Sequence, residues 1–275
     1  MCTVTFIARR NGYALGMNRD EKLTRDSARP AARHRLGDGV ALYPSEPNGG
    51  TWVGVNDSGA TLALINWYFV ATRVVGKTVS RGEAVRSALH SESPAGVDAT
   101  LAQLPLTRVN PFRLIAVFPK AKTVVEWRWD LRQLQRISHP WQINIWISSG
   151  FDERGAQRMR GKNFSDAVRQ SSAGSTEWLR RLQRSHGPER GPYSICMHRE
   201  DATTVSYTEV VVNRRAATLR YTPGAPCCTA AQPALSLAIT SRVDRVNLRY
   251  PSVRGITVES ELAHVSTHTR KEMTP

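Results

Sequence analysis

The first residues of the chain place a thiol near a charged pair. Cys2 follows Met1, and Arg19 and Asp20 come at the far end of the next predicted strand. A cysteine thiolate is a strong nucleophile, and a nearby arginine favours the thiolate over the thiol. When an aminopeptidase removes Met1, Cys2 also carries a free α-amine, whose ordinary pKa of about 8 suits a general base. One residue then supplies both the nucleophile and the base of a covalent catalyst.

The residue types alone leave a second interpretation open. In this interpretation Cys2 is a small, buried structural residue of a first strand, and Arg19 and Asp20 are a charged surface pair nearby. The elements that position these residues decide between a catalytic site and a plain structural domain.

The dipeptide Asn11-Gly12 is the feature that brings these residues together, because Asn-Gly is the strongest short-range signal for a two-residue hairpin turn. With that turn, Cys2 lies opposite Glu21, and Arg19 becomes its diagonal neighbour on the same face, at a Cα separation of about 7–8 Å. Asp20 falls on the opposite face, so it reaches Cys2 only through a bend or bulge at the strand end. The face of Cys2 is otherwise apolar and is completed by Val4, Phe6, Ala8, Tyr13, Leu15 and Met17.

Short β-strands dominate the rest of the pattern. Alternating and β-branched runs predict strands at residues 4–8, 13–17, 51–55, 61–67, 114–118, 123–129, 143–147, 193–198, 204–212 and 217–221. Helices are predicted after Ser80, which forms a capping box with Glu83, from Pro94, and after Ser175. Because short turns join neighbouring strands, the sheets are antiparallel and the fold class is α+β, with layered sheets and helices. We expect one domain over residues 1–258 and a flexible tail over residues 259–275.

The charge of the chain suggests the kind of partner. The net charge is +15, from 38 Lys and Arg against 23 Asp and Glu. The basic residues are scattered, and the run from Arg154 to Arg160 is predicted to be a solvated face. No motif of a nucleic-acid-binding module accompanies them, so we expect no specific nucleic-acid binding. The positive field favours a small, anionic substrate or ligand instead.

Other sequence features restrict the location and the cofactors. No apolar run approaches the roughly 18 residues that span a bilayer, so we expect no transmembrane segment and a cytoplasmic protein. The four cysteines form no C-x-x-C pair, and the histidines show no metal-ligand spacing; His198 is expected to be a structural residue. We therefore expect no metal and no other cofactor.

Four segments of the chain resemble the NRDE family, whose animal members are the transport-and-Golgi-organisation proteins. They are MCT at residues 1–3, GMNRDE at 16–21, GGTWVGV at 49–55 and LALINW at 62–67, in the order of the family. The family in turn resembles N-terminal nucleophile hydrolases (Ntn hydrolases) of the penicillin V acylase and bile salt hydrolase type. The resemblance implies a four-layer αββα sandwich of antiparallel sheets. It also implies hydrolysis of a carbon–nitrogen amide bond through a cysteine exposed by removal of the initiator methionine.

The resemblance also assigns roles to residues. Cys2 is the implied nucleophile and its α-amine the base, while Arg19 and Asp20 are the charged pair that orients it. Asn66 matches an asparagine that stabilises the oxyanion of the tetrahedral intermediate, and such a donor is typically worth about 10²–10³ in rate.

The chain departs from those enzymes at two points. A second asparagine has no counterpart in the segment ISSG at residues 147–150, where Ser149 or a backbone N–H is the candidate substitute. A later arginine of the acylases has three candidate matches, which are Arg154, Arg158 and Arg199.

The expected substrate-binding residues are Trp52, Trp67, Ser149 and Arg158. The two tryptophans flank the second predicted hairpin, where they form either core or pocket wall. Two alternatives to an enzyme stay open. One is a protein that binds or transfers a small ligand, such as an acyl or haem-like metabolite, without turnover, and the other is a purely structural domain.

Overall fold

Residues 2–240, which the computed structural model describes, form two antiparallel β-sheets that lie face to face. The first sheet contains β1 (Cys2–Arg9), β2 (Gly12–Lys22), β10 (Asn144–Ser148), β11 (Ala202–Val212), β12 (Ala216–Thr222) and β13 (Leu235–Ala238). Its strand order is β10-β1-β2-β11-β12-β13, so β1 and β2 lie in its interior.

The second sheet follows the chain order, with two helices in the connection between its fourth and fifth strands. It contains β3 (Arg29–Leu36), β4 (Gly39–Ser45), β5 (Val53–Asn56), β6 (Thr61–Asn66), β7 (Phe112–Phe118), β8 (Thr123–Trp129) and β9 (Leu134–His139). The helices are α1 (Arg81–Ala88), α2 (Pro94–Ala102), α3 (Glu153–Val168) and α4 (Thr176–Gln183), with a short 3₁₀ turn at Leu106–Arg108.

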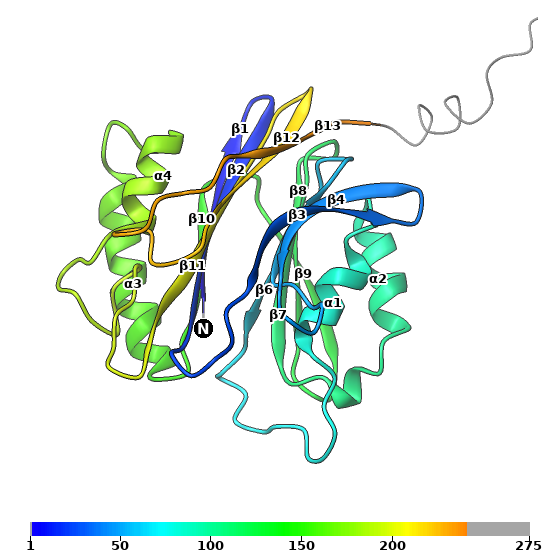
Figure 1. The fold of residues 1–275 in the computed structure, drawn as a ribbon, viewed down its shortest axis with the longest axis horizontal. Helices are drawn as coiled ribbons and strands as arrows, with labels where there is room; N and C mark the ends of the chain where they lie inside the picture. Colours follow the sequence, from blue (N-terminus) through cyan, green and yellow to red (C-terminus); the bar gives the residue numbers. More distant parts are fainter. Residues whose placement is uncertain (1, 241–275) are drawn as a thin grey trace, which may run out of the picture. The chain divides into compact units, whose positions relative to one another are not determined.

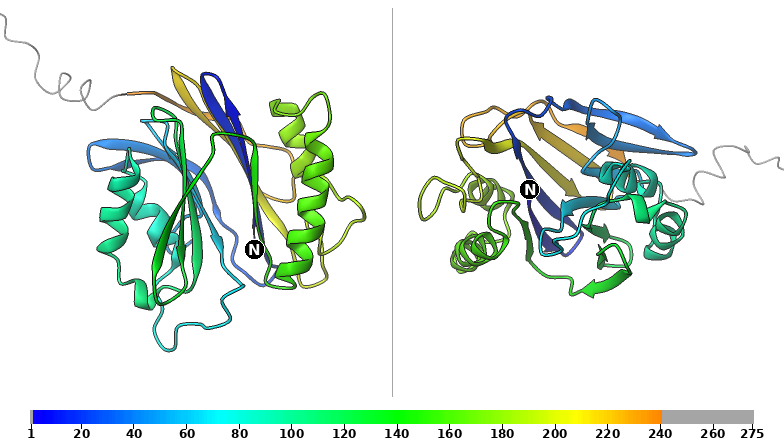
Figure 2. Two further views of the ribbon diagram at one scale, coloured as in Figure 1. Left: turned by 180° about the vertical axis from the view of Figure 1, so that it is seen from behind. Right: turned by 90° about the horizontal axis from the view of Figure 1, so that it is seen from below.

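The helices cover the outer faces of the two sheets. Helices α3 and α4 pack on the first sheet, and α1 and α2 pack on the second, which gives the layer order αββα (Figure 1). Figure 2 shows the same layers from behind and from below. The four-layer sandwich expected from the resemblance is therefore confirmed.

Alternation along the strands fills three apolar layers. Between the sheets, Phe6 and Leu15 of the first sheet meet Val53 and Ile115 of the second. The next residue along β1, Ile7, points the other way and packs in the layer formed with α3 and α4. The inner strands are covered on both faces, so their polar residues are buried as well, and each fully buried large apolar side chain contributes about 1.5–3 kcal/mol.

The first hairpin forms in a different register from the one predicted. Arg9 pairs with Gly12, so Arg10 and Asn11 make the turn, and Cys2 pairs with Arg19. The predicted pairing was wrong by two residues, but an even shift leaves every side chain on its predicted face. Gly12 has φ +138°, and a Cβ there would collide with the Val212 carbonyl of β11. The glycine is required by the close approach of the next strand rather than by a turn.

The predicted helix starts are confirmed, with one correction. Ser80 and Ser175 cap α1 and α4, and Pro94 stands at the first position of α2. The capping box does not form. Ser80 accepts a hydrogen bond from Gly82 N, while Glu83 binds Arg86 instead.

Two further predictions were wrong. The run from Arg154 to Arg160 is part of α3, which begins after Asp152, and Arg160 is fully buried rather than solvated. Residues 193–198 do not form a strand, because Ser194 Oγ binds the carbonyls of Gly191 and Cys196 and folds the segment into turns. The predicted domain end at residue 258 and the tail at 259–275 lie outside the described residues. No helix of residues 2–240 is long and apolar enough to cross a membrane.

A buried charge cluster joins the two sheets. The Glu126 carboxylate is fully buried and accepts hydrogen bonds from Arg113 at 2.5 Å, Arg128 at 2.8 Å and His139 at 2.7 Å. Trp146 of β10 also donates to it, at 3.3 Å. Burial by itself raises the pKa of Glu126, but the hydrogen bonds and the Arg113 charge outweigh it and hold this pKa well below its ordinary value of 4.5.

We predict that Glu126→Gln lowers the free energy of unfolding by about 3–5 kcal/mol at pH 7, because it removes one partner of a buried ion cluster. Since the folded-state pKa is depressed, the stability from Glu126 is complete above pH 4.5 and is lost as the pH falls below it. The variant should therefore show a weaker acid dependence than the wild type. Urea unfolding from pH 7 to below pH 4 measures both effects.

The exposed Glu177→Gln is the control, with an expected change within about 0.5 kcal/mol. Equal unfolding midpoints for the two variants would contradict the buried cluster.

Candidate active site

Strand pairing places Cys2 beside Arg19. Cys2 opens β1 and is paired with Ser148 of β10 on one side and with Arg19 of β2 on the other. Residues directly opposite in an antiparallel ladder project to the same face, so all three side chains point between the sheets. The predicted proximity of Arg19 and Cys2 is present, and it is closer than the diagonal relation expected from the turn.

A cavity of about 360 Å³ opens beside Cys2. A volume of this size suits a small molecule, since ligand sites usually measure about 300–1,000 Å³. The predicted site residues among its lining are Cys2, Arg19, Asp20, Trp52 and Asn66. Further charged residues on its walls are Glu21, Arg25, Glu46 and Arg81.

Arg19 is held rigidly on the cavity wall. Its guanidinium lies 4.3 Å from the centre of the Trp52 ring and donates to Glu46 at 2.8 Å. A second carboxylate, that of Glu21, is 3.7 Å away. The cation–π contact and the ion pairs fix the orientation of Arg19, so Trp52 supports the arginine as well as lining the cavity.

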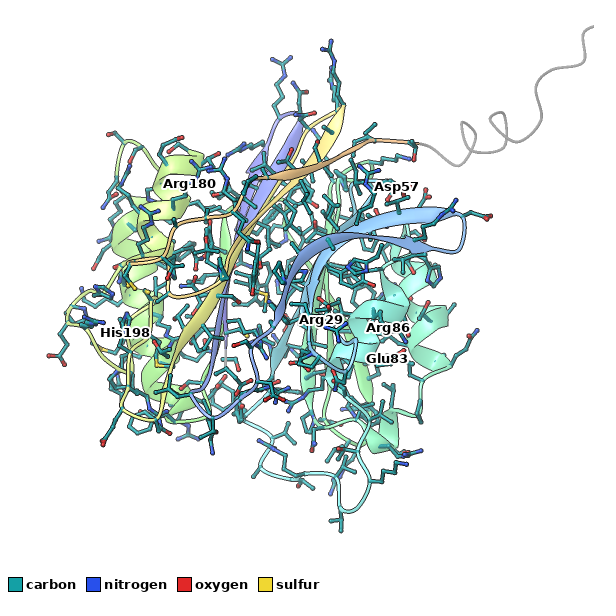
Figure 3. All side chains as sticks on the ribbon, viewed as in Figure 1. Arg29, Asp57, Glu83, Arg86, Arg180 and His198 are labelled. Atoms are coloured by element: carbon teal, nitrogen blue, oxygen red, sulfur yellow. The ribbon has the colours of Figure 1, made fainter. Side chains whose placement is uncertain are left out.

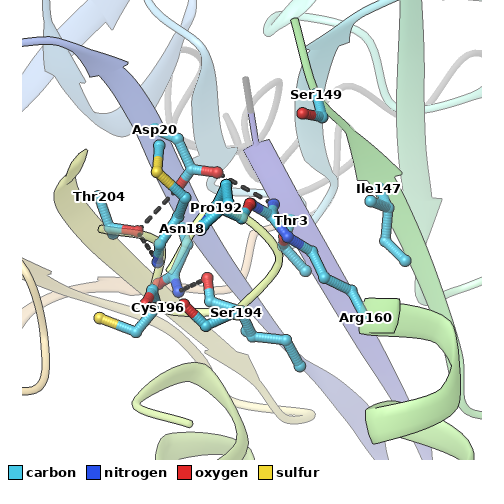
Figure 4. Close-up of polar contacts among 12 residues, drawn as sticks. Thr3, Asn18, Asp20, Ile147, Ser149, Arg160, Pro192, Ser194, Cys196 and Thr204 are labelled. Atoms are coloured by element: carbon cyan, nitrogen blue, oxygen red, sulfur yellow. Dashed lines mark hydrogen bonds and ion pairs between the residues drawn. The ribbon is translucent and has the colours of Figure 1, made fainter. Parts of the chain in front are cut away.

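Asp20 points to the other side of β2, as alternation requires. Its carboxylate accepts hydrogen bonds from Thr204 Oγ1 at 2.7 Å and from Arg160 Nη1 at 3.0 Å (Figure 4). Arg160 also donates to Thr3 Oγ1 at 2.8 Å and to the Pro192 carbonyl at 3.3 Å. Both charged side chains have no exposure. Asp20 therefore holds β2 in place from the face that packs against the helices.

The irregularity expected near Asp20 lies in the neighbouring strand. The pairing of β2 with β11 shifts register between Thr204 and Ser206, opposite Asp20 and Arg19. A bulge of this kind bends the strand and increases its local twist. Asp20 is among the residues that line the cavity, although its carboxylate faces the helices.

The environment of Cys2 does not produce a ready thiolate. Burial has the largest effect and raises the pKa of the Cys2 thiol. The positive charge of the N-terminal amine lowers this pKa, the Asp20 charge raises it, and the Arg19 and Glu21 charges have smaller, opposite effects. Arg19 lowers the pKa of the Cys2 thiol, as expected, but burial outweighs this one guanidinium, which also binds Glu46 and Glu21. A reaction at Cys2 needs a base that takes the thiol proton.

Asn66 lies across the cavity from the first sheet. It ends β6, is half-buried, and donates from Nδ2 to the Tyr68 hydroxyl at 2.8 Å. Tyr68 also packs on Gly150, where a Cβ would lie 2.9 Å from its ring. These contacts orient the Asn66 amide toward one position.

Three predicted substrate contacts are not part of the cavity lining. Trp67 is half-buried and stands 6.0 Å from the Arg128 guanidinium. Ser149 is buried, and its backbone N–H donates to Glu153 Oε2 at 2.5 Å. Arg158 is exposed on α3. The side chain that shares the face of Cys2 is Ser148, one residue earlier, and it is fully buried.

The later arginine predicted from the acylases has no counterpart on the cavity wall. Arg154 is exposed, and Arg199 lies 2.6 Å from Asp201. The cavity instead receives Arg25 and Arg81, which sequence reasoning did not single out. Arg81 directly follows the cap residue Ser80, so the sequence predicts its position at a helix start. The sequence does not predict that its side chain points into the cavity.

Arg81 differs from the other cations of the cavity in its partners. Arg19 and Arg25 both bind the Glu46 carboxylate at 2.8 Å. Arg81 donates to the Pro111 carbonyl at 3.4 Å, and within residues 2–240 no carboxylate lies at ion-pair distance from it. Burial lowers the pKa of Arg81, as expected for a cation that is partly removed from water.

We predict that Arg160→Met destabilises the protein by about 3–5 kcal/mol, because it leaves the Asp20 carboxylate buried without its charge partner. Arg158→Met is the matched control on the same helix, and its exposed position predicts a change within about 0.5 kcal/mol. Chemical unfolding of both variants measures the difference. If Arg160→Met unfolds at the same denaturant concentration as Arg158→Met, the buried pair does not hold β2 in place.

Comparisons with known proteins bear on the family and the fold. Residues 1–133 match the family model described as Transport and Golgi organisation 2. A comparison with curated proteins found no match.

Two crystal structures of conjugated bile acid hydrolase from Clostridium perfringens, one a mutant and one a variant, share the fold. Each has a TM-score of 0.51 and a sequence identity of 9%. The matches cover 83% and 88% of this chain and 92% and 97% of those chains. Penicillin V acylase from Agrobacterium tumefaciens aligns with a TM-score of 0.46 at 10% identity, over 80% of this chain and 82% of that one. The resemblance of the chain to the NRDE, or Transport and Golgi organisation 2, family is thus confirmed over residues 1–133, on the fold of an Ntn hydrolase.

Proposed function

We propose that the protein is an N-terminal cysteine nucleophile hydrolase that cleaves a carbon–nitrogen amide bond of a small substrate. The observation that carries the proposal is the position of Cys2. It opens an interior strand and lines a cavity of ligand size together with Arg19 and Asn66. A structural cysteine needs no such cavity, and the fold is one that bile acid hydrolases also have.

The raised thiol pKa gives the α-amine its role in this mechanism. After removal of Met1, the α-amine of Cys2 takes the thiol proton while the sulfur attacks the amide carbonyl carbon. The C–N bond then breaks, and the amine leaves with the proton from the α-ammonium group. The acyl group stays on Cys2 as a thioester. Water attacks the thioester while the α-amine accepts its proton, and the acid and the thiol are released.

Asn66 and Arg19 assist from fixed positions. An amide nitrogen has two hydrogens, so Asn66 Nδ2 retains one for a substrate oxyanion while it donates the other to Tyr68. Arg19 supplies positive charge opposite Cys2, held by Trp52 and Glu46, so it stabilises the thiolate as it forms.

Arg81 favours a substrate that carries an anionic group. Its guanidinium lacks a carboxylate partner among the described residues and lies on the wall of the cavity that Cys2 lines. The first residues of α1 line the same wall, and the N-terminal end of a helix carries partial positive charge.

Binding without turnover is the second candidate function, and one observation favours it. The Ser149 N–H, a candidate substitute for the second asparagine that the resemblance implies, is bound to Glu153. A site with fewer oxyanion donors suits a protein that holds or transfers an acyl or haem-like metabolite.

Turnover of a panel of small amides separates the two functions. We expect hydrolysis by the wild type, none by Cys2→Ala, and about a 10²–10³-fold lower kcat for Asn66→Ala. Cys228→Ala, which changes an exposed cysteine, serves as the control and should keep full activity. Intact mass must also show that Met1 is absent. Retained Met1, or equal turnover by Cys2→Ala, would refute hydrolysis, and ligand binding without turnover would support the second function.

Arg81→Gln tests the anionic preference. Loss of a hydrogen bond to a charged group costs about 1.5–3 kcal/mol, so kcat/KM for an amide with a carboxylate should fall about 10- to 100-fold. The matched neutral amide should change little. Equal losses on both substrates would show that Arg81 shapes the cavity without binding an anion.

A further inference from the structure

Folding brings together two histidines and two cysteines that are scattered in the sequence. The cluster consists of His186, Cys196, His198 and Cys227, and their ligand atoms all lie within 4.8 Å of one another. His186 follows α4, Cys196 and His198 belong to the turns before β11, and Cys227 lies in the connection from β12 to β13. Figure 3 shows His198 on the side of the molecule that carries α3 and α4.

Three spacings among the ligand atoms, all measured from His198, match those of tetrahedral coordination, and the remaining spacings are at most 4.8 Å. His198 Nε2 lies 3.2 Å from His186 Nε2, 3.6 Å from Cys196 Sγ and 3.4 Å from Cys227 Sγ. Bonds of about 2.0–2.1 Å from zinc to nitrogen and about 2.3 Å to sulfur set the ligand atoms of a tetrahedron about 3.3–3.8 Å apart. A metal ion at the centre of the four side chains therefore needs side-chain adjustments that bring the wider spacings to these values.

We propose that His186, Cys196, His198 and Cys227 bind a structural Zn²⁺ ion. Two thiolates with two imidazoles are a donor set that selects zinc over magnesium or calcium. Four protein ligands complete the tetrahedron and leave no position for substrate, which distinguishes a structural from a catalytic zinc. Binding releases the two thiol protons to solvent, and no electron is transferred.

Thr203 can hold the tautomer that zinc binding by His198 requires. Its hydroxyl donates to the Met197 carbonyl at 3.0 Å, so its oxygen is left to accept from His198 Nδ1, 3.3 Å away. A proton on Nδ1 leaves the Nε2 lone pair directed at the cluster. Arg190 Nη2 also lies 3.3 Å from Nδ1. It can only donate, so this exposed side chain must move aside when Nδ1 keeps its proton.

The zinc site supports β2, the strand of Arg19 and Asp20, on the face opposite to the cavity. Met197, between two of the ligands, donates its N–H to Thr204 Oγ1 at 2.8 Å, and Thr204 donates to Asp20 at 2.7 Å. Asn18 Nδ2 donates to the Ile195 carbonyl at 2.9 Å. Figure 4 shows Cys196 beside Asn18 in this network. Zinc therefore fastens an irregular segment whose pairing with β11 is a single isolated bridge between His198 and Thr203.

Metal analysis of the full-length protein, purified without a polyhistidine tag, tests the site. We expect one zinc per chain in the wild type and in Cys228→Ser, and loss of zinc in Cys227→Ser. The two variants change neighbouring cysteines, of which Cys227 alone belongs to the cluster. Thr203→Val should bind zinc about 10- to 100-fold more weakly. A wild type without zinc after incubation with Zn²⁺, or equal zinc in both serine variants, overturns the proposal.

Cobalt substitution of the wild type makes the test independent of how well the variants fold. Co²⁺ bound to two thiolates and two imidazoles gives intense tetrahedral bands in the visible range and sulfur-to-cobalt charge transfer in the near ultraviolet. We expect both, and their loss on addition of excess Zn²⁺. Their absence overturns the proposal, and so does a disulfide between Cys196 and Cys227 in the unreduced protein.

Discussion

The buried ion pair between Asp20 and Arg160 is the interaction on which the geometry of the candidate site depends. Two charges without exposure carry a desolvation penalty of several kcal/mol each, which their mutual attraction offsets only with further hydrogen bonds. Thr204 supplies one to Asp20, and Thr3 and the Pro192 carbonyl accept two from Arg160. Because Asp20 is held toward the helices, its neighbour Arg19 must point the other way, toward Cys2.

On the cavity side of β2, burial and charge act on Cys2 in opposite directions. Arg19 favours the thiolate, but it is shared with two carboxylates, and burial dominates the pKa of the thiol. A cysteine in that state is unreactive until a base approaches it. The α-amine of the same residue is the nearest group that chain processing could supply, and this gives chemical meaning to a cysteine at position 2.

The sequence predicted the faces of the first hairpin and the layers of the fold better than the register or the helices. Alternation fixes which side chains share a face, so Cys2 and Arg19 were placed together although the turn was misassigned. The Asn-Gly pair predicted the wrong turn residues, because Gly12 is needed for the close contact with Val212 and not for the turn. This contact is with a residue far away in the sequence. Helix α3 was missed because its inward face carries Arg160, whose partner lies far away in the sequence.

The same limitation applies to the His–Cys cluster. Metal-ligand motifs are recognised when the ligands come in close pairs, whereas here Cys227 is separated from the other three ligands by β11 and β12. The two tryptophans show the limit on a smaller scale. Trp52 and Trp67 flank one hairpin, but only Trp52 is among the residues that line the cavity.

Trapping of an acyl-enzyme tests the central claim most directly, which is that the thiol and the α-amine of Cys2 act together. The protein with Met1 removed is mixed with an activated acyl compound, quenched in acid, and its N-terminal peptide is weighed. Protein that retains Met1, produced with methionine aminopeptidase inhibited, is treated alongside. We expect rapid acylation of Cys2 in the processed protein and little in the unprocessed one. Equal acylation of both forms, or none in either, would contradict it.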